Sequence, residues 1–246
     1  MSAIFELSGV TKNFGGVRAV SEMSFSIPEG ELAGLMGPNG AGKTTIFNLV
    51  TGVYDPDEGS ILFRGENLVP LKTFDIVHKG IARTFQNLRL FQRSSVLENV
   101  MTAAQQHVPY TFFEGMTHLG RWRSKESDIR KKSMELLERV GLADRANQAA
   151  GTLPYGHQRR LEIARALALD PKLLLLDEPA AGMNAEEVLS LNSLIRSIHT
   201  DFKLTILVIE HHMDLIMEIC PHIVCMNFGA KIAEGTPDEI QNHPEV

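Results

Sequence analysis

The chain has 246 residues, of which 43% are hydrophobic, and its formal net charge is −6. This length allows one large domain or two small ones, and the acidic balance argues against a protein that binds nucleic acid through its charge. No apolar run approaches the roughly 18 residues of a membrane-spanning helix, and the first residues lack the basic and apolar regions of a signal peptide. We therefore expect a soluble, cytoplasmic chain that reaches a membrane only through a partner.

Residues 3–36 alternate short apolar runs with turn residues. Met23, Phe25 and Ile27 alternate at period two, which predicts a strand. We expect an antiparallel β region that leads into a buried strand at 31–36. Phe14 lies near the start of this region, where its ring could stack on an adenine base. An ordinary position in the core is the simpler interpretation of this aromatic residue.

A glycine-rich segment follows the predicted strand and reads Gly37-Pro38-Asn39-Gly40-Ala41-Gly42-Lys43-Thr44-Thr45. It fits the pattern G-x-x-x-x-G-K-[ST], whose backbone N–H groups cradle phosphates. Its glycines allow backbone conformations that other residues avoid. Lys43 can reach the outer phosphates, and the Thr44 hydroxyl suits Mg²⁺, which prefers oxygen ligands. A helix predicted over residues 45–50 would point its N-terminus at the phosphates, so we predict a nucleotide-binding loop rather than a chance match.

A strand predicted over residues 81–85 ends at Gln86. The Gln86 amide could ligate Mg²⁺ or orient a water molecule, although a single glutamine is weak evidence by itself. From about residue 94 to 150 helical periods dominate, which predicts a helical subdomain inserted into the β-containing core. The aromatic residues from Tyr110 to Trp122 are expected to pack inside this subdomain, or else to form an exposed contact with another subunit.

A continuous apolar run at 173–176 predicts a buried parallel strand that ends at Asp177 and Glu178. Asp177 could hold Mg²⁺ opposite Thr44, and Glu178 could polarise an attacking water molecule. The simpler alternative is a pair of acids that starts a turn or caps a helix. The phosphate-binding loop upstream favours the catalytic interpretation.

Gly156 precedes a strong helix predicted over residues 159–168, and it frees the backbone there to approach a ligand. A second buried strand, at 204–209, is followed by His211. A histidine at this place could sense a terminal phosphate, although a hydrogen-bonded loop histidine is the alternative. Shorter elements are predicted before and after these, namely a strand at 60–63, a helix at 71–79, a helix at 213–220, strands at 223–226 and 231–234, and a helix at 237–242.

Together and in this order, these motifs resemble those of the ATP-binding subunits of ABC transporters, over essentially the whole chain. The resemblance places the Walker A loop at 37–44, the Q-loop glutamine at Gln86, the signature motif at 153–158, the Walker B strand at 173–178, the D-loop at 181–184, the switch histidine at His211 and the adenine-stacking aromatic at Phe14. It implies an α/β fold: a P-loop ABC ATPase core with a mostly parallel sheet, an N-terminal antiparallel β subdomain and a helical subdomain inserted at about 94–157. Residues 1–246 would form a single nucleotide-binding domain.

The resemblance also implies ATP hydrolysis that drives solute import, with ATP and Mg²⁺ as cofactors. Residues 37–45 would hold the phosphates. Thr44, Gln86 and Asp177 would organise Mg²⁺, Glu178 would activate water, and His211 would stabilise the γ-phosphate. Two ATPase chains would sandwich two ATP molecules, so that Tyr155, Gly156, His157 and Gln158 of one chain contact the nucleotide of the other. The implied partners are a second ATPase subunit, membrane-spanning permease subunits and, indirectly, a substrate-binding protein, at the cytoplasmic face of the cell membrane.

Residues 153–165, 177–182 and 209–211 look like the branched-chain amino-acid importer subfamily, and the helical segment near 108–125 is similar to the larger of its two ATPase subunits. Urea-type relatives share much of this pattern, so the solute stays open. Pro154 departs from the usual signature serine, because proline has neither a hydroxyl nor an N–H group, and His157 and Asn184 also depart from the family pattern. A non-transport ABC ATPase and a regulatory nucleotide binder without hydrolysis are the alternatives.

Overall fold

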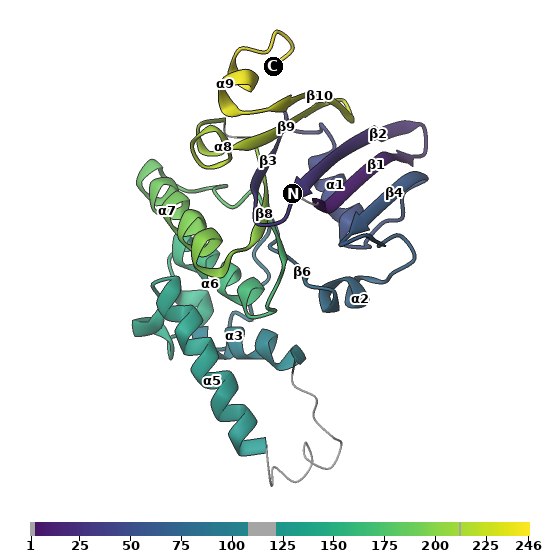
Figure 1. Ribbon diagram of the computed structural model, residues 1–246. Helices are drawn as coiled ribbons and strands as arrows, with labels where there is room; N and C mark the ends of the chain where they lie inside the picture. The colour runs from purple at the N-terminus through teal and green to yellow at the C-terminus, as the bar shows by residue number, and fades with distance from the viewer. Residues whose placement is uncertain (1–2, 108–121, 212) are drawn as a thin grey trace. The chain divides into compact units, whose positions relative to one another are not determined.

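The computed structural model describes residues 3–107, 122–211 and 213–246. The chain forms two compact units (Figure 1): Met1–Gln86 together with Lys172–Val246, and Asn87–Pro171. The aromatic residues predicted to pack inside the helical subdomain lie, from 110 to 121, outside the described residues. Among the described helices, none is both long and apolar enough to cross a membrane.

An antiparallel sheet opens the first unit. Its strands are β1 (Ala3–Phe14), β2 (Val17–Pro28), β4 (Glu58–Phe63) and β5 (Glu66–Asn67), in the spatial order β2-β1-β4-β5. Alternate β2 residues such as Met23, Phe25 and Ile27 are buried, which confirms the period-two prediction. The two-residue strand β5 was not predicted, because it is too short to carry a periodic pattern.

A second sheet follows and is mostly parallel. Its strands are β3 (Leu32–Met36), β6 (Ile81–Arg83), β7 (Leu173–Asp177), β8 (Thr205–Glu210), β9 (His222–Asn227) and β10 (Ala230–Gly235), in the order β10-β9-β3-β8-β7-β6. All pairs are parallel except β10 with β9. Every residue of β3, β7 and β8 is buried, as expected for strands covered on both faces.

The main hydrophobic core of this unit lies between the two sheets and surrounds helix α1 (Lys43–Val50). Phe47 on α1 is fully buried, and α1 contacts both β2 and β7. Alternate residues of the parallel strands, including Leu173 and Leu175, join the same core. One face of the mixed sheet therefore fixes α1, and with it the loop that precedes the helix.

Helix α7 (Ala185–Phe202) was not predicted. Asn184 caps its start by accepting a hydrogen bond from the Glu187 N–H, and the Glu187 carboxylate accepts the Asn184 N–H in return. This capping box, followed by buried Leu191 and Ile195, is a recognisable helix signal. The sequence argument overlooked it because residues 181–184 were treated only as a functional loop. Three shorter helices complete the unit, α2 (Thr73–His78), α8 (Met213–Ile219) and α9 (Pro237–Gln241).

Helix α8 packs closely on the parallel strands β3 and β8. Gly34 on β3 permits this approach, because a Cβ atom there would lie 2.8 Å from the Ile216 side chain. Cys220 and Cys225 are both 1% exposed, and burial raises the pKa of their thiols to about 12 and about 11. The two cysteines are therefore small, unreactive packing residues.

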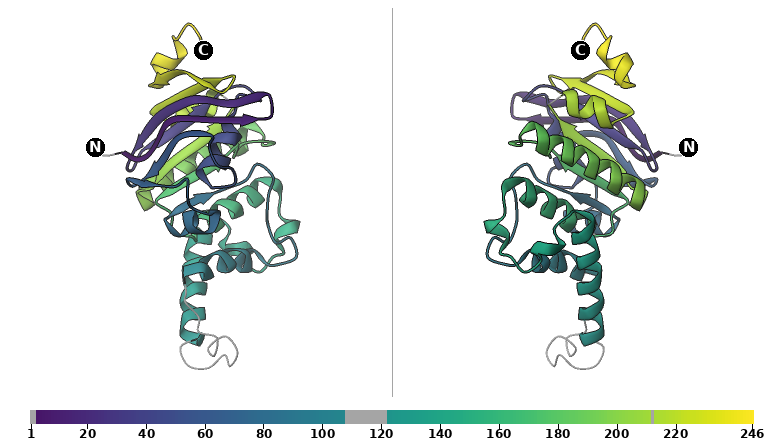
Figure 2. Two further views of the ribbon diagram at one scale, coloured as in Figure 1. Left: turned by 90° about the vertical axis from the view of Figure 1, so that its right-hand side faces the viewer. Right: turned by 90° about the vertical axis from the view of Figure 1, so that its left-hand side faces the viewer.

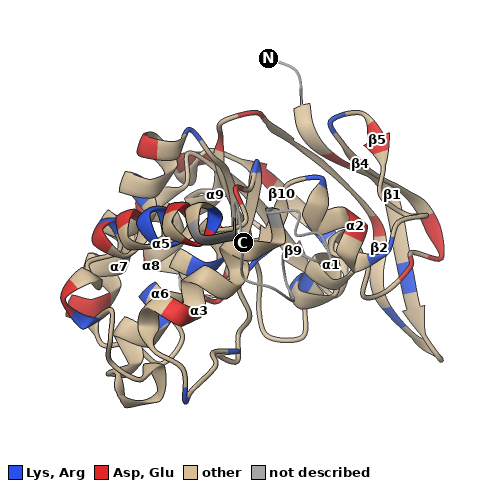
Figure 3. Cartoon of the chain, turned by 90° about the horizontal axis from the view of Figure 1, so that it is seen from below, with Lys and Arg blue, Asp and Glu red and all other residues tan. Residues whose placement is uncertain are grey.

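The second unit is helical. It contains α3 (Val96–Ala104), α5 (Trp122–Arg139) and α6 (Tyr155–Leu167), which contact one another, and short 3-10 turns at Gln105–His107, Ala143–Arg145 and Ala150–Thr152. The buried Asn99 side chain accepts a hydrogen bond from the Phe91 N–H and donates one to the Phe91 carbonyl oxygen, and it thereby holds the loop before α3. Helix α5, the long teal helix of Figure 2, contains both acidic and basic residues along its length (Figure 3), which is typical of a solvated helix surface.

Candidate functional site

The predicted site residues of the first unit follow the carboxyl ends of neighbouring parallel strands. Gly37 follows β3, Gln86 comes shortly after β6, Glu178 follows β7, and His211 follows β8. Ligands of open α/β sheets bind at this edge, because the loops there converge. The turn after β9, which carries Phe228, opens at the same edge.

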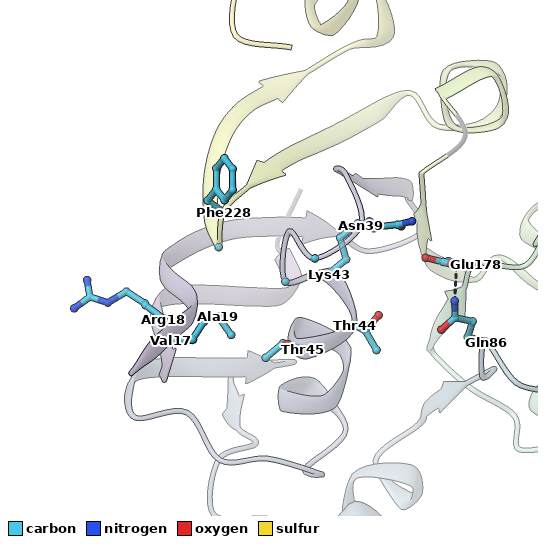
Figure 4. Close-up of a pocket in the computed structure, with 13 residues that line it drawn as sticks. Val17, Arg18, Ala19, Asn39, Lys43, Thr44, Thr45, Gln86, Glu178 and Phe228 are labelled. Atoms are coloured by element: carbon cyan, nitrogen blue, oxygen red, sulfur yellow. Dashed lines mark hydrogen bonds between the residues drawn. The ribbon is translucent and has the colours of Figure 1, made fainter. Parts of the chain in front are cut away.

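A cavity of about 440 Å³ lies at this edge (Figure 4). Predicted residues that line it are Asn39, Gly40, Gly42, Lys43, Thr44, Thr45, Gln86 and Glu178. Residues that the sequence argument missed also line it, namely Val17, Arg18, Ala19, Phe228 and Gly229. These come from β2 and from the β9–β10 turn, and the sequence holds no local signal that either approaches the phosphate-binding loop.

The glycines of the loop serve two different needs. Gly40 and Gly42 have φ values of 80° and 104°, in the left-handed region that favours glycine. Gly42 also leaves no room for a side chain, because a Cβ atom would lie 2.4 Å from the Ala19 carbonyl oxygen. The prediction was wrong for Gly37, which is not in the left-handed region. It is needed because a Cβ atom there would lie 2.2 Å from the Met226 carbonyl oxygen.

Helix α1 begins at Lys43, with Gly42 as N-cap and no capping side chain. No capping side chain accepts the first N–H groups of this helix, which lie at the cavity. These N–H groups and the positive end of the helix dipole can therefore bind an anion. The Lys43 ammonium donates hydrogen bonds to the carbonyl oxygens of Gly37 (2.6 Å) and Pro38 (3.0 Å). Burial lowers the pKa of Lys43, while the nearby Glu178 carboxylate counteracts this shift.

Glu178 is held beside two other predicted residues. Its Oε2 atom accepts a hydrogen bond of 2.7 Å from Gln86 Nε2, the dashed contact of Figure 4. Its Oε1 atom lies 3.6 Å from Nδ1 of His211, whose side chain is 31% exposed. Three residues from three different strand ends thus meet around one carboxylate, which fits the catalytic interpretation better than a simple turn.

The backbone at Glu178 is strained, with φ at 44° in the left-handed region. Such a conformation costs on the order of 1–3 kcal/mol and persists only where the surroundings enforce it. The Glu178 N–H donates to the Ile209 carbonyl oxygen at 3.0 Å. Glu210, which is fully buried, accepts hydrogen bonds from the N–H groups of Ala180 (2.9 Å) and His211 (3.2 Å). Glu210 therefore ties the turn at Glu178 to the loop of His211, a role that the sequence argument missed.

Asp177 is 1% exposed at the end of β7, and its Oδ2 atom accepts a hydrogen bond of 2.6 Å from Arg83. The Asp177 N–H donates to the hydroxyl of Thr84 at 3.2 Å. Sequence reasoning treated the strand before Gln86 only as a carrier of that glutamine and missed Arg83. No sequence pattern links the two residues, because they are 94 positions apart.

Phe14 does not line the cavity. Phe14 is 42% exposed. Its ring lies edge-on to the ring of Tyr54, with the two centroids 5.1 Å apart, and the Lys12 ammonium lies 5.7 Å from the centre of the Phe14 ring. The structure thus rules out an ordinary core position for this ring. Stacking of Phe14 on a base stays a prediction.

The predicted signature residues lie in the second unit. Helix α6 begins at Tyr155 with Pro154 as N-cap, so the prediction that Gly156 precedes the helix was wrong: Gly156 lies in its first turn. Pro154 also fixes the N-cap geometry, since its carbonyl oxygen accepts the N–H groups of His157 and Gln158, both at 3.0 Å. The Tyr155 hydroxyl accepts two hydrogen bonds from the guanidinium of buried Arg159, at 2.7 and 3.1 Å.

Comparison with known families adds to this geometry. A family profile described as "ABC transporter" matches residues 20–181, which include the phosphate-binding loop and both strand-end acids. The chain belongs to the ABC transporter family. A second profile, described as "Branched-chain amino acid ATP-binding cassette transporter", matches residues 230–246.

Curated ABC transporter proteins match over nearly the full length. The chain is 44% identical to the high-affinity branched-chain amino acid transport ATP-binding protein BraF of Pseudomonas aeruginosa, over 99% of this chain and 95% of that protein. It is 42% identical to LivG of Escherichia coli K12 with the same coverage, and 35% identical to a probable LivG of Archaeoglobus fulgidus, over 99% of this chain and 93% of that protein.

Solved ABC cassettes share the fold. An ATP-binding cassette of an ABC transporter in its ADP conformation has a TM-score of 0.87 and 28% identity, with 100% of this chain and 97% of that one covered. A nucleotide-free cassette has a TM-score of 0.85 and 28% identity, with 100% and 96% covered. The chain is thus an ABC ATPase that binds ATP, and the predicted α/β fold with a mostly parallel sheet and an antiparallel β region is confirmed.

Proposed function

We propose that this ABC ATPase is the ATP-hydrolysing subunit of an importer for branched-chain amino acids. The observation that carries the ATPase role is the meeting of the phosphate-binding loop, Gln86 and Glu178 around one cavity. The choice of solute rests on the names of relatives that are 42–44% identical and on the family profile that matches residues 230–246.

The residues around the cavity fit Mg²⁺. The Thr44 hydroxyl, the Gln86 amide oxygen and the Asp177 carboxylate are all oxygen donors, which this hard cation prefers. Thr44 and Gln86 line the cavity, and Asp177 ends the neighbouring strand β7. We assign these three residues to the metal, which when bound would neutralise charge on the phosphates.

In this proposal the loop from Gly37 to Thr45 binds the phosphates through its N–H groups. Lys43, which now donates to carbonyl oxygens of its own loop, would exchange those partners for phosphate oxygens. Burial disfavours the charged form of Lys43, and a phosphate anion would offset that cost through strong charge-assisted hydrogen bonds. Phe14 would stack on the adenine ring from the hairpin between β1 and β2.

Glu178 would act as the general base that orients and polarises the attacking water. The Gln86 amide that now holds its Oε2 atom must give way to that water. His211, 3.6 Å from the other carboxylate oxygen, would donate a hydrogen bond to the γ-phosphate and stabilise the charge that builds up there.

A second ATPase chain would complete the site by presenting Tyr155, Gly156, His157 and Gln158 of its signature motif. ATP binding would close the pair and hydrolysis would reopen it. Permease subunits in the membrane would convert this closure into transport, with the ATPase bound peripherally at the cytoplasmic face. No nucleic acid takes part in this cycle.

The test uses the complex purified from native membranes through a tag on this chain. We would measure ATP turnover with leucine-loaded and then with urea-loaded substrate-binding protein. Stimulation by the leucine-loaded protein is the expected result. Stimulation only by the urea-loaded protein would refute the choice of solute, and recovery of the chain without any membrane subunit would refute the importer function.

A further inference from the structure

Arg83 bridges the two elements that carry the proposed metal ligands. We propose that Arg83 is a positioning residue that fixes the Asp177 carboxylate relative to the Thr44 hydroxyl, and that it thereby makes nucleotide binding depend on Mg²⁺. The inference rests on the proposed function of the cavity. It assigns a role to a side chain that the phosphate-binding motifs do not include.

The register of the sheet brings Arg83 to Asp177. Arg83 on β6 pairs with Leu175 on the parallel strand β7, and Asp177 lies two residues further along β7 on the same face. This diagonal position is within reach of a long side chain. Arg83 Nη2 accordingly donates to Asp177 Oδ2 at 2.6 Å, and the two side chains are only 7% and 1% exposed.

The other arm of the guanidinium reaches helix α1. Arg83 Nη1 donates to Asn48 Oδ1 at 2.7 Å and lies 3.4 Å from the Thr51 hydroxyl. Thr44 and Asn48 are four residues apart in α1, so they lie on the same face of the helix. Arg83 therefore connects the face of α1 that carries Thr44 with the carboxylate of Asp177.

The orientation of the guanidinium is itself fixed by two aromatic rings. Its carbon lies 5.4 Å from the centre of the Phe47 ring and 5.2 Å from that of Phe85. Only arginine combines a planar fork, which can bond two elements at once, with favourable contact to aromatic faces. A lysine at this position would keep the charge but would reach one partner at a time.

A buried carboxylate without a cationic partner is unstable as an ion. The ion pair with Arg83 holds the Asp177 carboxylate in one orientation before nucleotide binds, and partners of this kind commonly change metal affinity by about 10- to 100-fold. The inference predicts a specific defect when Arg83 is replaced. Mg²⁺ should raise the affinity for nucleotide only at higher concentrations, while nucleotide binding without metal should change little.

The experiment measures binding of a fluorescent ATP analogue to the full chain, first in EDTA and then over a series of free Mg²⁺ concentrations. For Arg83→Met we expect affinity in EDTA within about 2-fold of wild type. We expect the free Mg²⁺ concentration that gives half of the maximal gain in nucleotide affinity to rise by about 10-fold or more. Arg83→Lys should lie between the two. The exposed control Arg64→Met removes a 3.4 Å surface ion pair with Glu29 and a contact with the Phe63 ring, both away from the cavity, and should match wild type.

A double variant tests whether Arg83 acts through Asp177. In an Asp177→Asn background, Arg83→Met should cause no further loss of Mg²⁺ dependence. If Arg83→Met does not fold, Asn48→Ala supplies the same test, because it removes only the contact with α1 and should weaken the Mg²⁺ effect in the same direction. Unchanged Mg²⁺ dependence, or an equal loss of affinity with and without Mg²⁺, would overturn the inference. Failure of the wild-type chain to bind nucleotide would instead overturn the proposed function of the cavity.

Discussion

Replacement of Glu210 by glutamine tests how the catalytic turn is held. Glu210 is 0% exposed and accepts hydrogen bonds from the N–H groups of Ala180 and His211. Hydrogen bonds to a charged group contribute about 1.5–3 kcal/mol each. Glutamine keeps one acceptor oxygen but turns its NH₂ group towards the second N–H, so one bond is lost and two donors face each other.

We therefore expect Glu210→Gln to lower the free energy of unfolding by about 2–3 kcal/mol. The strained turn at Glu178 would then lose one of its restraints, so the Glu178 carboxylate would be less well placed. We expect kcat for ATP hydrolysis to fall by about 10- to 100-fold and KM to change less, because the backbone N–H groups that would bind phosphate belong to a different loop, although Lys43 loses the electrostatic support of the Glu210 charge.

Urea denaturation followed by circular dichroism, together with steady-state ATPase kinetics, measures both effects. Glu29→Gln is the matched control, since it removes the same charge from a 61% exposed side chain in a surface ion pair, where the effect should be at most about 1 kcal/mol. If Glu210→Gln were within about 0.5 kcal/mol of wild type and hydrolysed ATP normally, the argument that Glu210 holds this turn would be wrong.

The remaining predictions concern the cavity and the β1–β4 edge. Glu178→Gln should bind ATP but lose steady turnover, and turnover at the wild-type rate would exclude Glu178 as the base. Gly42→Ala should destabilise the nucleotide-free chain by about 3 kcal/mol or more, since it adds a 2.4 Å clash to left-handed strain. Gly40→Ala, with nothing within 4 Å, should cost only about 1–2 kcal/mol, and equal losses in denaturation would contradict the steric argument. Phe14→Ala should weaken ATP binding by about 5- to 150-fold, equivalent to about 1–3 kcal/mol of stacking, whereas Phe14→Trp should preserve it in a fluorescence titration. The hydrogen bond from Lys12 lowers the pKa of Asp57, so this carboxylate stabilises the fold at neutral pH, and the contribution disappears as pH falls through its lowered pKa. The unfolding free energies of wild type and Asp57→Asn should therefore converge in acid, and curves that stay parallel would refute the link.

The sequence determined the elements whose signals are local. The alternation of Met23, Phe25 and Ile27 predicted β2, and the four leucines at 173–176 predicted a strand buried on both faces. Both patterns can be recognised from residues that are close together in the sequence. The phosphate-binding loop was equally clear, since its glycines, lysine and threonine must be adjacent to act together. Helix α7 also had a local signal in its capping box. We overlooked that signal because residues 181–184 had already been interpreted as a functional loop.

The tertiary structure alone decided which distant residues meet. Gly37 is needed for its closeness to Met226 rather than for its own φ angle, and Arg83 and Glu210 act on Asp177 and Ala180 across strands. These contacts depend on the order and register of the sheet, which brings together positions that are far apart in the chain. A single sequence carries no record of that register, because pairing between strands is set by the packing of the whole core.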